Sequence, residues 1–234
     1  MSRANAAAML MLGTTVTDPD FALVAGLWHF DFITTIIVPV FPDSSANGNN
    51  LTLGGPPTVD TSNFKFGPGS MLNGSGAGAQ VISAGFTFGT GDFCVESFFY
   101  PTNLAAGYEC LWDAEGGGAS IRCYPSFNGD GNIQIYVGGT LLQGGACTAN
   151  AWNHCITSRV SGRTYLGLNG AEQGTPGGVA DTNNYTATTF TVGNWNGFSQ
   201  ALIGNVDETR ATVGSGRGYV GGSYIVPTAP YPNS

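Results

Sequence analysis

The carboxylates are the first residues to test for catalytic spacing. Hydrolysis of a glycosidic bond needs two carboxyl groups that flank the bond, one as acid and the other as base or nucleophile. Asp113 and Glu115 have the alternate spacing that places both on one strand face, but they fall at an expected turn beside three glycines. Asp207 and Glu208 are adjacent, so a strand would point them to opposite faces. Glu96 has no carboxylate two residues away. We therefore predict that the protein is not an enzyme and has no catalytic residues.

Histidine and cysteine form no catalytic or metal-binding pattern. His29 and His154 each lie close to a tryptophan in a strand-like run, and no nucleophile elbow is present, so we interpret both as core or sheet-surface residues. The cysteines are odd in number and lack metal-ligand spacing. We predict free thiols, made in a reducing cytoplasm. A hairpin around residues 115–118 would bring Cys110 close to Cys123. The full set is Cys94, Cys110, Cys123, Cys147 and Cys155.

Trp195 is the aromatic residue best placed to contact a ligand. It lies in the polar, glycine-rich segment 193–197, with Asn194 and Asn196 on either side. An exposed tryptophan beside amide groups can contact a sugar or anchor a protein partner. We predict that Trp195, Asn194 and Asn196 contact a partner protein or a glycan, with the protein favoured. The other tryptophans stand in strand-like runs: Trp28, Trp112 and Trp152.

One strand organises the elements that position these residues. The stretch from Phe93 to Tyr100 is apolar on both faces, which is typical of a strand in the middle of a sheet with a layer on each side. Glu96 interrupts one of its apolar rows. Because an unpaired buried carboxylate is costly, we predict that Glu96 makes a buried charged contact with Arg159 or Arg210 that ties two sheets together.

Composition indicates an all-β protein. The 234 residues include 37 glycines, 14 Phe, 9 Tyr and 4 Trp, and short strand-like runs alternate with turn clusters. Charged residues are only 9% of the chain, and a net charge of −8 argues against a nucleic-acid partner. No apolar run approaches the length of a membrane span.

The chain divides into an arm and one domain. Residues 1–20 lack a strand pattern and are predicted to form an N-terminal arm for docking or oligomer contact, with an apolar part at Ala6–Leu12. The alternative interpretation of this segment is a signal peptide. Residues 21–234 are predicted to form a single domain that ends in a proline-rich tail, because neither a repeat nor a linker interrupts them.

A series of short motifs in fixed order carries a family resemblance over residues 21–232. They are Leu27–Asp31, Asp43–Ser45 with Asn47, Phe66–Gly67 with Ser70–Met71, Gly91–Glu96, Trp152–His154 leading to Thr157 and Arg159, Asn169–Gly170, Gly204–Arg210 and Pro227–Pro232. With its motifs in this order, the chain resembles the concanavalin A-like lectin and glucanase superfamily, specifically its laminin-G-like jelly-roll branch. The resemblance implies a two-sheet antiparallel jelly-roll sandwich.

Relatives of this branch often carry calcium, so the resemblance raises the question of a Ca²⁺ site. Asp31, Asp43, Asn47 and Asp207 are expected near strand ends and could converge, although Ca²⁺ takes six to eight oxygen ligands. The alternative is that Asp43 caps a turn while Asp31 and Asp207 hold backbone amides. We favour this structural role and predict no cofactor, with Ca²⁺ left open.

The proline-rich ending resembles domains carried on bacteriophage particles. This resemblance implies a virion structural protein, a decoration protein on the capsid or tail surface that is made in the host cytoplasm. Its expected partners are the major capsid protein or other virion proteins, with a homo-oligomer and a cell-surface glycan as further partners left open. One alternative is a carbohydrate-binding adhesin for host attachment. Another is a secreted glycan-binding or glycan-hydrolysing domain.

Overall fold

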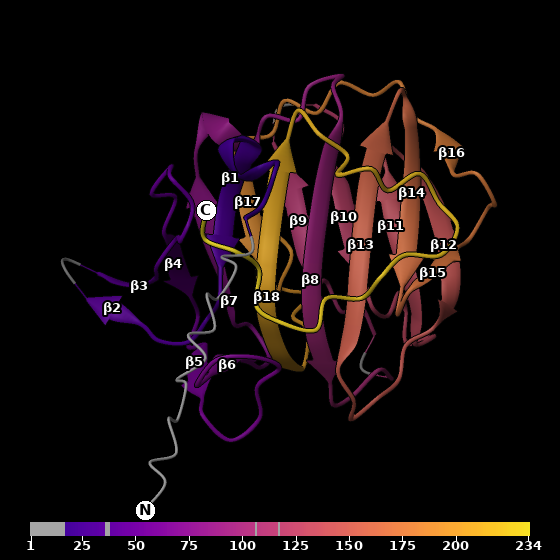
Figure 1. Ribbon diagram of the computed structural model, residues 1–234. Helices are drawn as coiled ribbons and strands as arrows, with labels where there is room; N and C mark the ends of the chain where they lie inside the picture. The colour runs from indigo at the N-terminus through magenta and orange to yellow at the C-terminus, as the bar shows by residue number, and fades with distance from the viewer. Residues whose placement is uncertain (1–16, 36–37, 106, 117) are drawn as a thin grey trace, which may run out of the picture.

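The computed structural model describes residues 17–35, 38–105, 107–116 and 118–234, which form two nine-stranded antiparallel sheets (Figure 1). The predicted all-β, two-sheet jelly-roll sandwich is confirmed. Most of the predicted N-terminal arm, including its apolar part Ala6–Leu12, lies outside the described residues. Among those described, no helix has the length and apolar character needed to span a bilayer.

The first sheet, called sheet A, has the strand order β15-β14-β13-β8-β18-β6-β5, with β1 also paired to β18 and β16 to β14. Its strands are β1 (Val24–Trp28), β5 (Thr58–Asp60), β6 (Ser70–Asn73), β8 (Phe93–Pro101), β13 (Asn153–Val160), β14 (Arg163–Leu168), β15 (Ala171–Gln173), β16 (Val179–Ala180) and β18 (Gly204–Val213).

The second sheet, sheet B, has the order β12-β11-β10-β9-β17-β7-β4-β3-β2. Its strands are β2 (Thr34–Thr35), β3 (Pro39–Phe41), β4 (Leu51–Gly54), β7 (Gly78–Ile82), β9 (Trp112–Glu115), β10 (Ile121–Tyr124), β11 (Asn132–Val137), β12 (Thr140–Ala146) and β17 (Thr189–Val192). Two short 3₁₀ turns complete the described elements: η1 (Phe21–Leu23) and η2 (Ala84–Phe86).

Strand β8 lies between β13 and β18, and both of its faces are covered, as its sequence predicts. Phe93, Val95 and Phe99 point into the main core between the sheets. Cys94 and Phe98 point to the outer face of sheet A and pack in two smaller clusters there. Because side chains alternate between the two faces of β8, the strand contributes residues to two separate apolar layers.

Residues 214–234, called the C-terminal tail, cover this outer face and cross β18, β8, β13 and β14 (Figure 1). Tyr231 of the tail is 3% exposed and packs in the cluster that contains Phe98. The Ser158 hydroxyl donates a 2.6 Å hydrogen bond to the Tyr219 carbonyl, and the Asp18 N–H donates a 2.7 Å bond to the carbonyl of Ser234. The tail is thus a packed layer of the domain.

The space between the sheets is filled by stacked aromatic rings. Phe190 is at the centre, with ring centroids 4.9 Å from Phe86, 5.7 Å from Trp28 and 6.1 Å from Trp112. Trp28 and Trp112 are fully buried, as expected of tryptophans in strands. Burial of several large rings supplies much of the apolar stabilisation of this sandwich.

Candidate functional site: the Trp195 loop, a neutral cleft and the tail pocket

Residues 193–203 connect β17 of sheet B to β18 of sheet A and are called the Trp195 loop. The side-chain amide of Asn73 donates to the carbonyls of Gly193 and Leu202, at 2.5 and 2.9 Å, so one buried residue holds both ends of the loop. The Trp195 indole N–H donates to a carboxylate oxygen of Glu115. The loop is therefore fixed against the outer face of sheet B.

Arg122 stacks between two aromatic rings on this face. Its guanidinium carbon lies 5.6 Å from the Trp195 ring centroid and 5.5 Å from that of Tyr136, which faces Arg122 in the β10–β11 register. Arg122 also forms ion pairs with Asp113 at 3.1 Å and with Glu115 at 2.9 Å. The arrangement combines cation–π contacts with two paired carboxylates.

Asp113 and Glu115 lie in strand β9, which corrects their expected position at a turn. The ladder to β17 continues as far as Glu115, which faces Thr189, and this pairing keeps the segment extended. Both side chains point to the outer face of sheet B. However, Asp113 is fully buried, and burial raises its pKa to about 7 despite the charge of Arg122.

The asparagines beside Trp195 have different roles from those expected. Asn194 is fully buried: its side-chain N–H donates to the Ala77 carbonyl, and its oxygen accepts from the N–H groups of Trp195 and Gln200. It therefore cannot contact a partner, which corrects that prediction. Asn196 is half-buried, and its backbone N–H donates to Asp113 at 3.1 Å. Of the predicted contact residues, Trp195 and Asn196 reach the surface.

A cleft of about 520 Å³ opens at the far end of the Trp195 loop. Tyr108 contributes an aromatic side chain that is 42% exposed, and Phe198 contributes a second ring. The lining contains no Asp, Glu, Lys, Arg or His: it is Ser75, Gly76, Asn103, Tyr108, Phe198, Ser199, Ala201 and Ile203.

Two glycines set the position of the Phe198 ring. Gly54 and Gly78 face each other in the β4–β7 register. A Cβ atom at Gly54 would lie 2.1 Å from the Phe198 ring, and one at Gly78 would lie 3.2 Å from it. Only glycine at Gly54 leaves the ring room to lie against the sheet. Residue spacing does not reveal this cleft, because its lining comes from three separate segments, none of which has a distinctive pattern.

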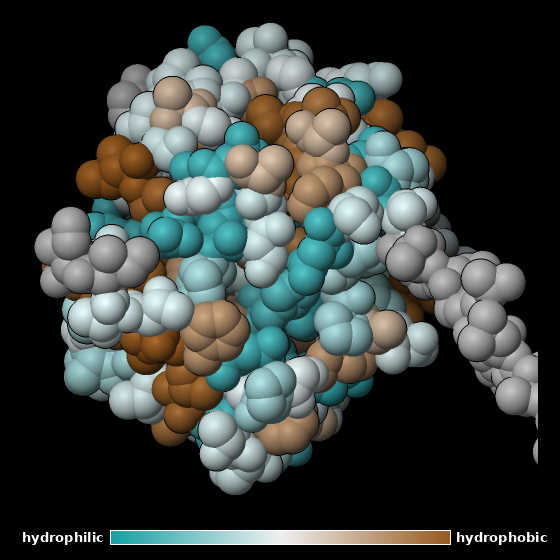
Figure 2. All heavy atoms as spheres, turned by 60° about the vertical axis from the view of Figure 1, so that its left-hand side comes forward, coloured by the Kyte–Doolittle hydropathy of each residue, from teal (hydrophilic) through white to brown (hydrophobic). Residues whose placement is uncertain are grey.

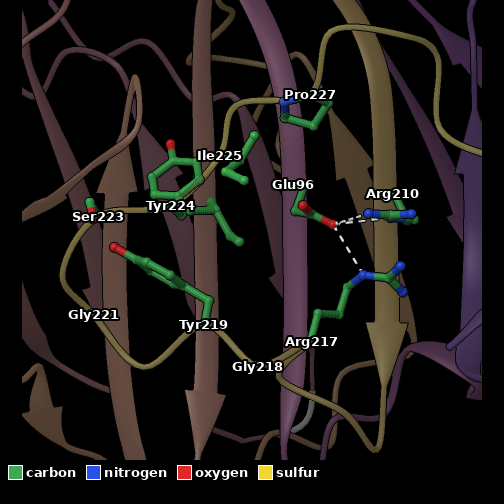
Figure 3. A pocket seen from close by; sticks show the side chains of 11 residues that line it. Glu96, Arg210, Arg217, Gly218, Tyr219, Gly221, Ser223, Tyr224, Ile225 and Pro227 are labelled. Atoms are coloured by element: carbon green, nitrogen blue, oxygen red, sulfur yellow. Dashed lines mark hydrogen bonds and ion pairs between the residues drawn. The ribbon is translucent and has the colours of Figure 1, made fainter. Parts of the chain in front are cut away.

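A second pocket, of about 410 Å³, lies between the outer face of sheet A and the C-terminal tail (Figure 3). Its floor carries Glu96, whose carboxylate points toward Arg210 and Arg217, while Tyr219 and Tyr224 line the opposite side. The charges are balanced within the protein, because both guanidinium groups are paired with carboxylates. We call this the tail pocket.

The predicted contact of Glu96 is made with Arg210 and not with Arg159. Glu96 Oε2 accepts from Arg210 Nε at 3.0 Å and from Nη2 at 2.6 Å. Arg210 also binds Asp18 at 2.8 Å, and Arg217 lies 3.4 Å from Glu96. The network joins neighbouring strands of sheet A to the N-terminal segment and the tail, so it does not tie the two sheets together, which corrects that part of the prediction.

Arg159 has another role at one end of the core. Its guanidinium is fully buried and donates to the carbonyls of Gly91, Asn183 and Gly89, at 2.7, 2.9 and 2.7 Å. Asp181 lies 3.5 Å away as its counter-ion. Arg159 thus ties the segment that leads from η2 into β8 to the segment that leads from β16 into β17, by backbone contacts that residue spacing does not reveal.

The residues considered as possible Ca²⁺ ligands have hydrogen-bonding roles in the fold. Asp43 accepts from three backbone N–H groups and from the Ser45 hydroxyl, as a turn-capping residue would. Asn47 donates its side-chain amide to the Val24 carbonyl. Within the described ranges, no three His, Cys, Asp or Glu side chains converge as metal ligands.

Asp207 and Asp31 hold backbone amides, the structural role that the sequence favours. Asp207 Oδ2 accepts from the N–H groups of Lys65 and Phe66, at 2.8 and 3.1 Å, while its Oδ1 is buried without a partner. Burial raises the pKa of Asp207 to about 8, so this carboxyl group favours its protonated form at pH 7. Asp31 accepts from the Gly69 N–H, and burial raises its pKa as well.

Both histidines hold the C-terminal tail. His29 Nδ1 lies 2.7 Å from Glu208, and its Nε2 lies 2.8 Å from Asn233 in the tail. His154 contacts the hydroxyls of Tyr224 and Tyr231, at 3.2 and 3.0 Å. Burial lowers the pKa of His154 to about 4, so it is neutral at pH 7.

Comparison with family models decides the classification. Residues 73–212 match the model described as the concanavalin A-like lectin/glucanases superfamily. The chain belongs to this superfamily. Comparison with the curated proteins gives no match.

Solved structures of the superfamily fold include glycan complexes. Domain 4 of AbnA, a GH43 extracellular arabinanase from Geobacillus stearothermophilus in complex with arabinotriose, has a TM-score of 0.59 at 20% identity over 86% of this chain and 94% of that one. Trypanosoma rangeli sialidase in complex with sialic acid has a TM-score of 0.59 at 14% identity, over 82% of this chain and 31% of the sialidase. The binding domain of botulinum neurotoxin DC in complex with SialylT has a TM-score of 0.54 at 11% identity, over 82% and 48%. At these sequence identities the structural similarity shows a shared fold and nothing beyond it.

Proposed function

We propose that the protein is a non-enzymatic glycan-binding module whose ligand is a neutral oligosaccharide held in the cleft between Tyr108 and Phe198. The observation that carries the proposal is the composition of this cleft. Two aromatic rings can stack on the apolar face of a sugar, while the amide of Asn103 and the hydroxyls of Ser75 and Ser199 can bond its hydroxyl groups.

The charge distribution favours a neutral sugar over an acidic one. Tight recognition of a sugar carboxylate uses an unpaired guanidinium or ammonium group. No Lys or Arg lines the cleft, and Arg122 on the neighbouring face is already paired with Asp113 and Glu115. The net charge of −8 adds a general repulsion of anions.

The non-enzymatic part of the proposal rests on the state of the two strand carboxylates. A glycosidase needs both carboxyl groups to reach the scissile bond. Asp113 is fully buried, and Arg122 pairs with both Asp113 and Glu115. We infer that this pair positions Arg122 and the Trp195 loop. Further support for glycan binding comes from the arabinotriose and SialylT complexes of the two fold neighbours.

A glycan array followed by titration calorimetry tests the proposal. We expect neutral oligosaccharides to bind, with arabinotriose as the first neutral probe and sialyllactose as the acidic one. Tyr108→Ala should weaken binding about tenfold, which is ~1.4 kcal/mol. Ile225→Ala, which alters a side chain 92% exposed on the tail, is the matched control and should bind as the wild type. Absence of any neutral ligand, or full binding by Tyr108→Ala, would overturn the assignment.

The virion setting is a separate part of the proposal. We propose that the module is displayed on a phage capsid or tail surface, where it contacts virion proteins and presents its cleft. Its support is the family resemblance of the chain ending and the charged fraction of 9%. On the face seen in Figure 2, hydrophobic residues form separate clusters divided by polar ones, so that face offers small contacts rather than one continuous docking surface.

Quantitative peptide mass spectrometry of purified phage particles tests this setting. A copy number near that of the major coat protein would mean a lattice-wide decoration protein. A far lower number would mean an adhesin at a vertex or tail. Absence of the protein from the particles would exclude the virion setting and leave glycan binding to be judged by its own test.

A further inference from the structure

Two cysteines from different sheets meet in the core. Cys123 lies in β10 of sheet B, and Cys155 lies in β13 of sheet A. Their sulfur atoms are 3.5 Å apart, and both side chains are fully buried. The pair therefore bridges the two sheets, between positions 32 residues apart in the chain.

The other cysteines are placed differently. The Cys110 thiol donates to the Trp112 carbonyl at 3.3 Å, and Cys94 packs in the cluster on the outer face of sheet A. Cys123 faces Trp112 in the β9–β10 register, and its carbonyl accepts from the Leu111 N–H, so the hairpin brings Cys110 close to Cys123, as residue counting predicted. Among the described residues, Cys123 and Cys155 form the one thiol pair with a sulfur–sulfur contact.

We propose that Cys123 and Cys155 are a disulfide site, which closes when the chain folds in the presence of a small oxidising disulfide such as oxidised glutathione. The two thiols lose two protons and two electrons, one S–S bond forms between them, and the glutathione disulfide is reduced to two glutathione thiols. A disulfide sulfur pair is separated by about 2.05 Å, so closure of the 3.5 Å contact brings the two sulfur atoms about 1.5 Å closer together.

The location of the pair determines when the bond can form. Burial raises the pKa of the Cys123 thiol well above its ordinary value, and the thiolate is the form that attacks a disulfide. In the folded protein the pair is also closed to solvent. Oxidation therefore takes place during folding or transient opening, and a chain folded in a reducing cytoplasm keeps both thiols.

The bond would couple the sheets covalently. It would close a loop that contains β11 and β12, which pack on one another and on β14. A cross-link of this length restricts the unfolded chain and stabilises the fold. The protein would then be more stable in an oxidising environment than in the cell that makes it.

The experiment refolds the full chain from denaturant in a glutathione redox buffer or in dithiothreitol, then alkylates free thiols and maps the peptides. We expect a Cys123–Cys155 cross-linked peptide only after refolding in the glutathione buffer, with the other three cysteines alkylated. The oxidised protein should melt about 5–10 °C higher than the reduced one. Five alkylated cysteines after oxidative refolding, or a bond from Cys123 to Cys110 or Cys147, would overturn the proposal.

Single variants supply the control. Cys94→Ala removes a buried thiol of sheet A that lies outside the pair and should leave the cross-link intact. Cys155→Ala should abolish it together with the redox dependence of the melting temperature. The peptide map of the wild-type chain decides the outcome even if either variant fails to fold.

Discussion

Glu96 and Arg210 form a buried, doubly hydrogen-bonded pair on adjacent strands, with both donor nitrogens on one carboxylate oxygen, at 3.0 and 2.6 Å. Asp18 and Arg217 extend the pair into a network of two acids and two bases. The network is the point at which the N-terminal segment, the central strands and the C-terminal tail meet.

The first prediction concerns this network. Glu96→Gln leaves Arg210 buried without its main counter-ion, and loss of one partner of a buried pair costs about 3 kcal/mol, or about 6–12 °C in melting temperature for a chain of this size. Differential scanning calorimetry measures the change. Ile82→Val, at a position 73% exposed on strand β7 of sheet B, is the control and should change little. An unchanged melting curve for Glu96→Gln would contradict a stabilising role of the pair.

The second prediction concerns His29 and alkaline pH. Burial disfavours the cation, but the hydrogen bond and charge of Glu208 outweigh it and raise the His29 pKa from 6.5 to about 9. Because the folded state holds this proton more tightly, the stabilisation is complete below pH 6.5 and is lost as pH rises through about 9. We expect the melting temperature to fall between pH 7 and 10, and His29→Gln to flatten this dependence. Equal pH dependence of the melting temperature in the two proteins would count against this role of His29.

The third prediction concerns Glu109, which is fully buried and has no side-chain partner for either oxygen. Burial raises its pKa from 4.5 to about 7. The folded state therefore holds the proton of Glu109 more tightly than the unfolded chain does. The resulting stabilisation is complete below pH 4.5 and is lost as pH rises through about 7. Glu109→Gln removes the buried charge and should stabilise the protein by ~1–2 kcal/mol at pH 8, with little change at pH 5. Urea titrations at both pH values measure this, and a variant less stable at pH 8 would refute it.

The fourth prediction concerns calcium. Asp43 and Asn47 are engaged in hydrogen bonds, and Asp207 is protonated at pH 7, so added Ca²⁺ should leave the melting temperature unchanged. Asp207→Asn keeps the oxygen that accepts from Lys65 and Phe66, and we expect it to fold with near wild-type stability at pH 7. A Ca²⁺-dependent rise in melting temperature that disappears in Asp207→Asn would establish a metal site instead.

Local pattern was sufficient for several features of the fold. The alternation from Phe93 to Tyr100 predicted a central strand covered on both faces, because side-chain direction along a strand follows directly from sequence order. The pairs Gly138–Gly139 and Ser161–Gly162 are typical of tight hairpin turns, because few residues adopt the positive φ angles of such turns. They connect β11 to β12 and β13 to β14. The chain has only seven Lys and Arg residues, which limited the candidate partners considered for Glu96 to Arg159 and Arg210.

Contacts between residues far apart in the sequence were decided by the tertiary structure. Spacing could not choose between Arg159 and Arg210 for Glu96, because the choice depends on which face of each strand meets which layer. The meeting of Cys123 with Cys155 depends on how the two sheets are stacked. The cleft beside Phe198 depends on three loops that converge at one end of the strands. Sequence alone determined the central strand β8, the two-sheet fold class and the need of Glu96 for a charged partner. Strand register and sheet packing, which are set by burial of the whole core, determined which partners they found.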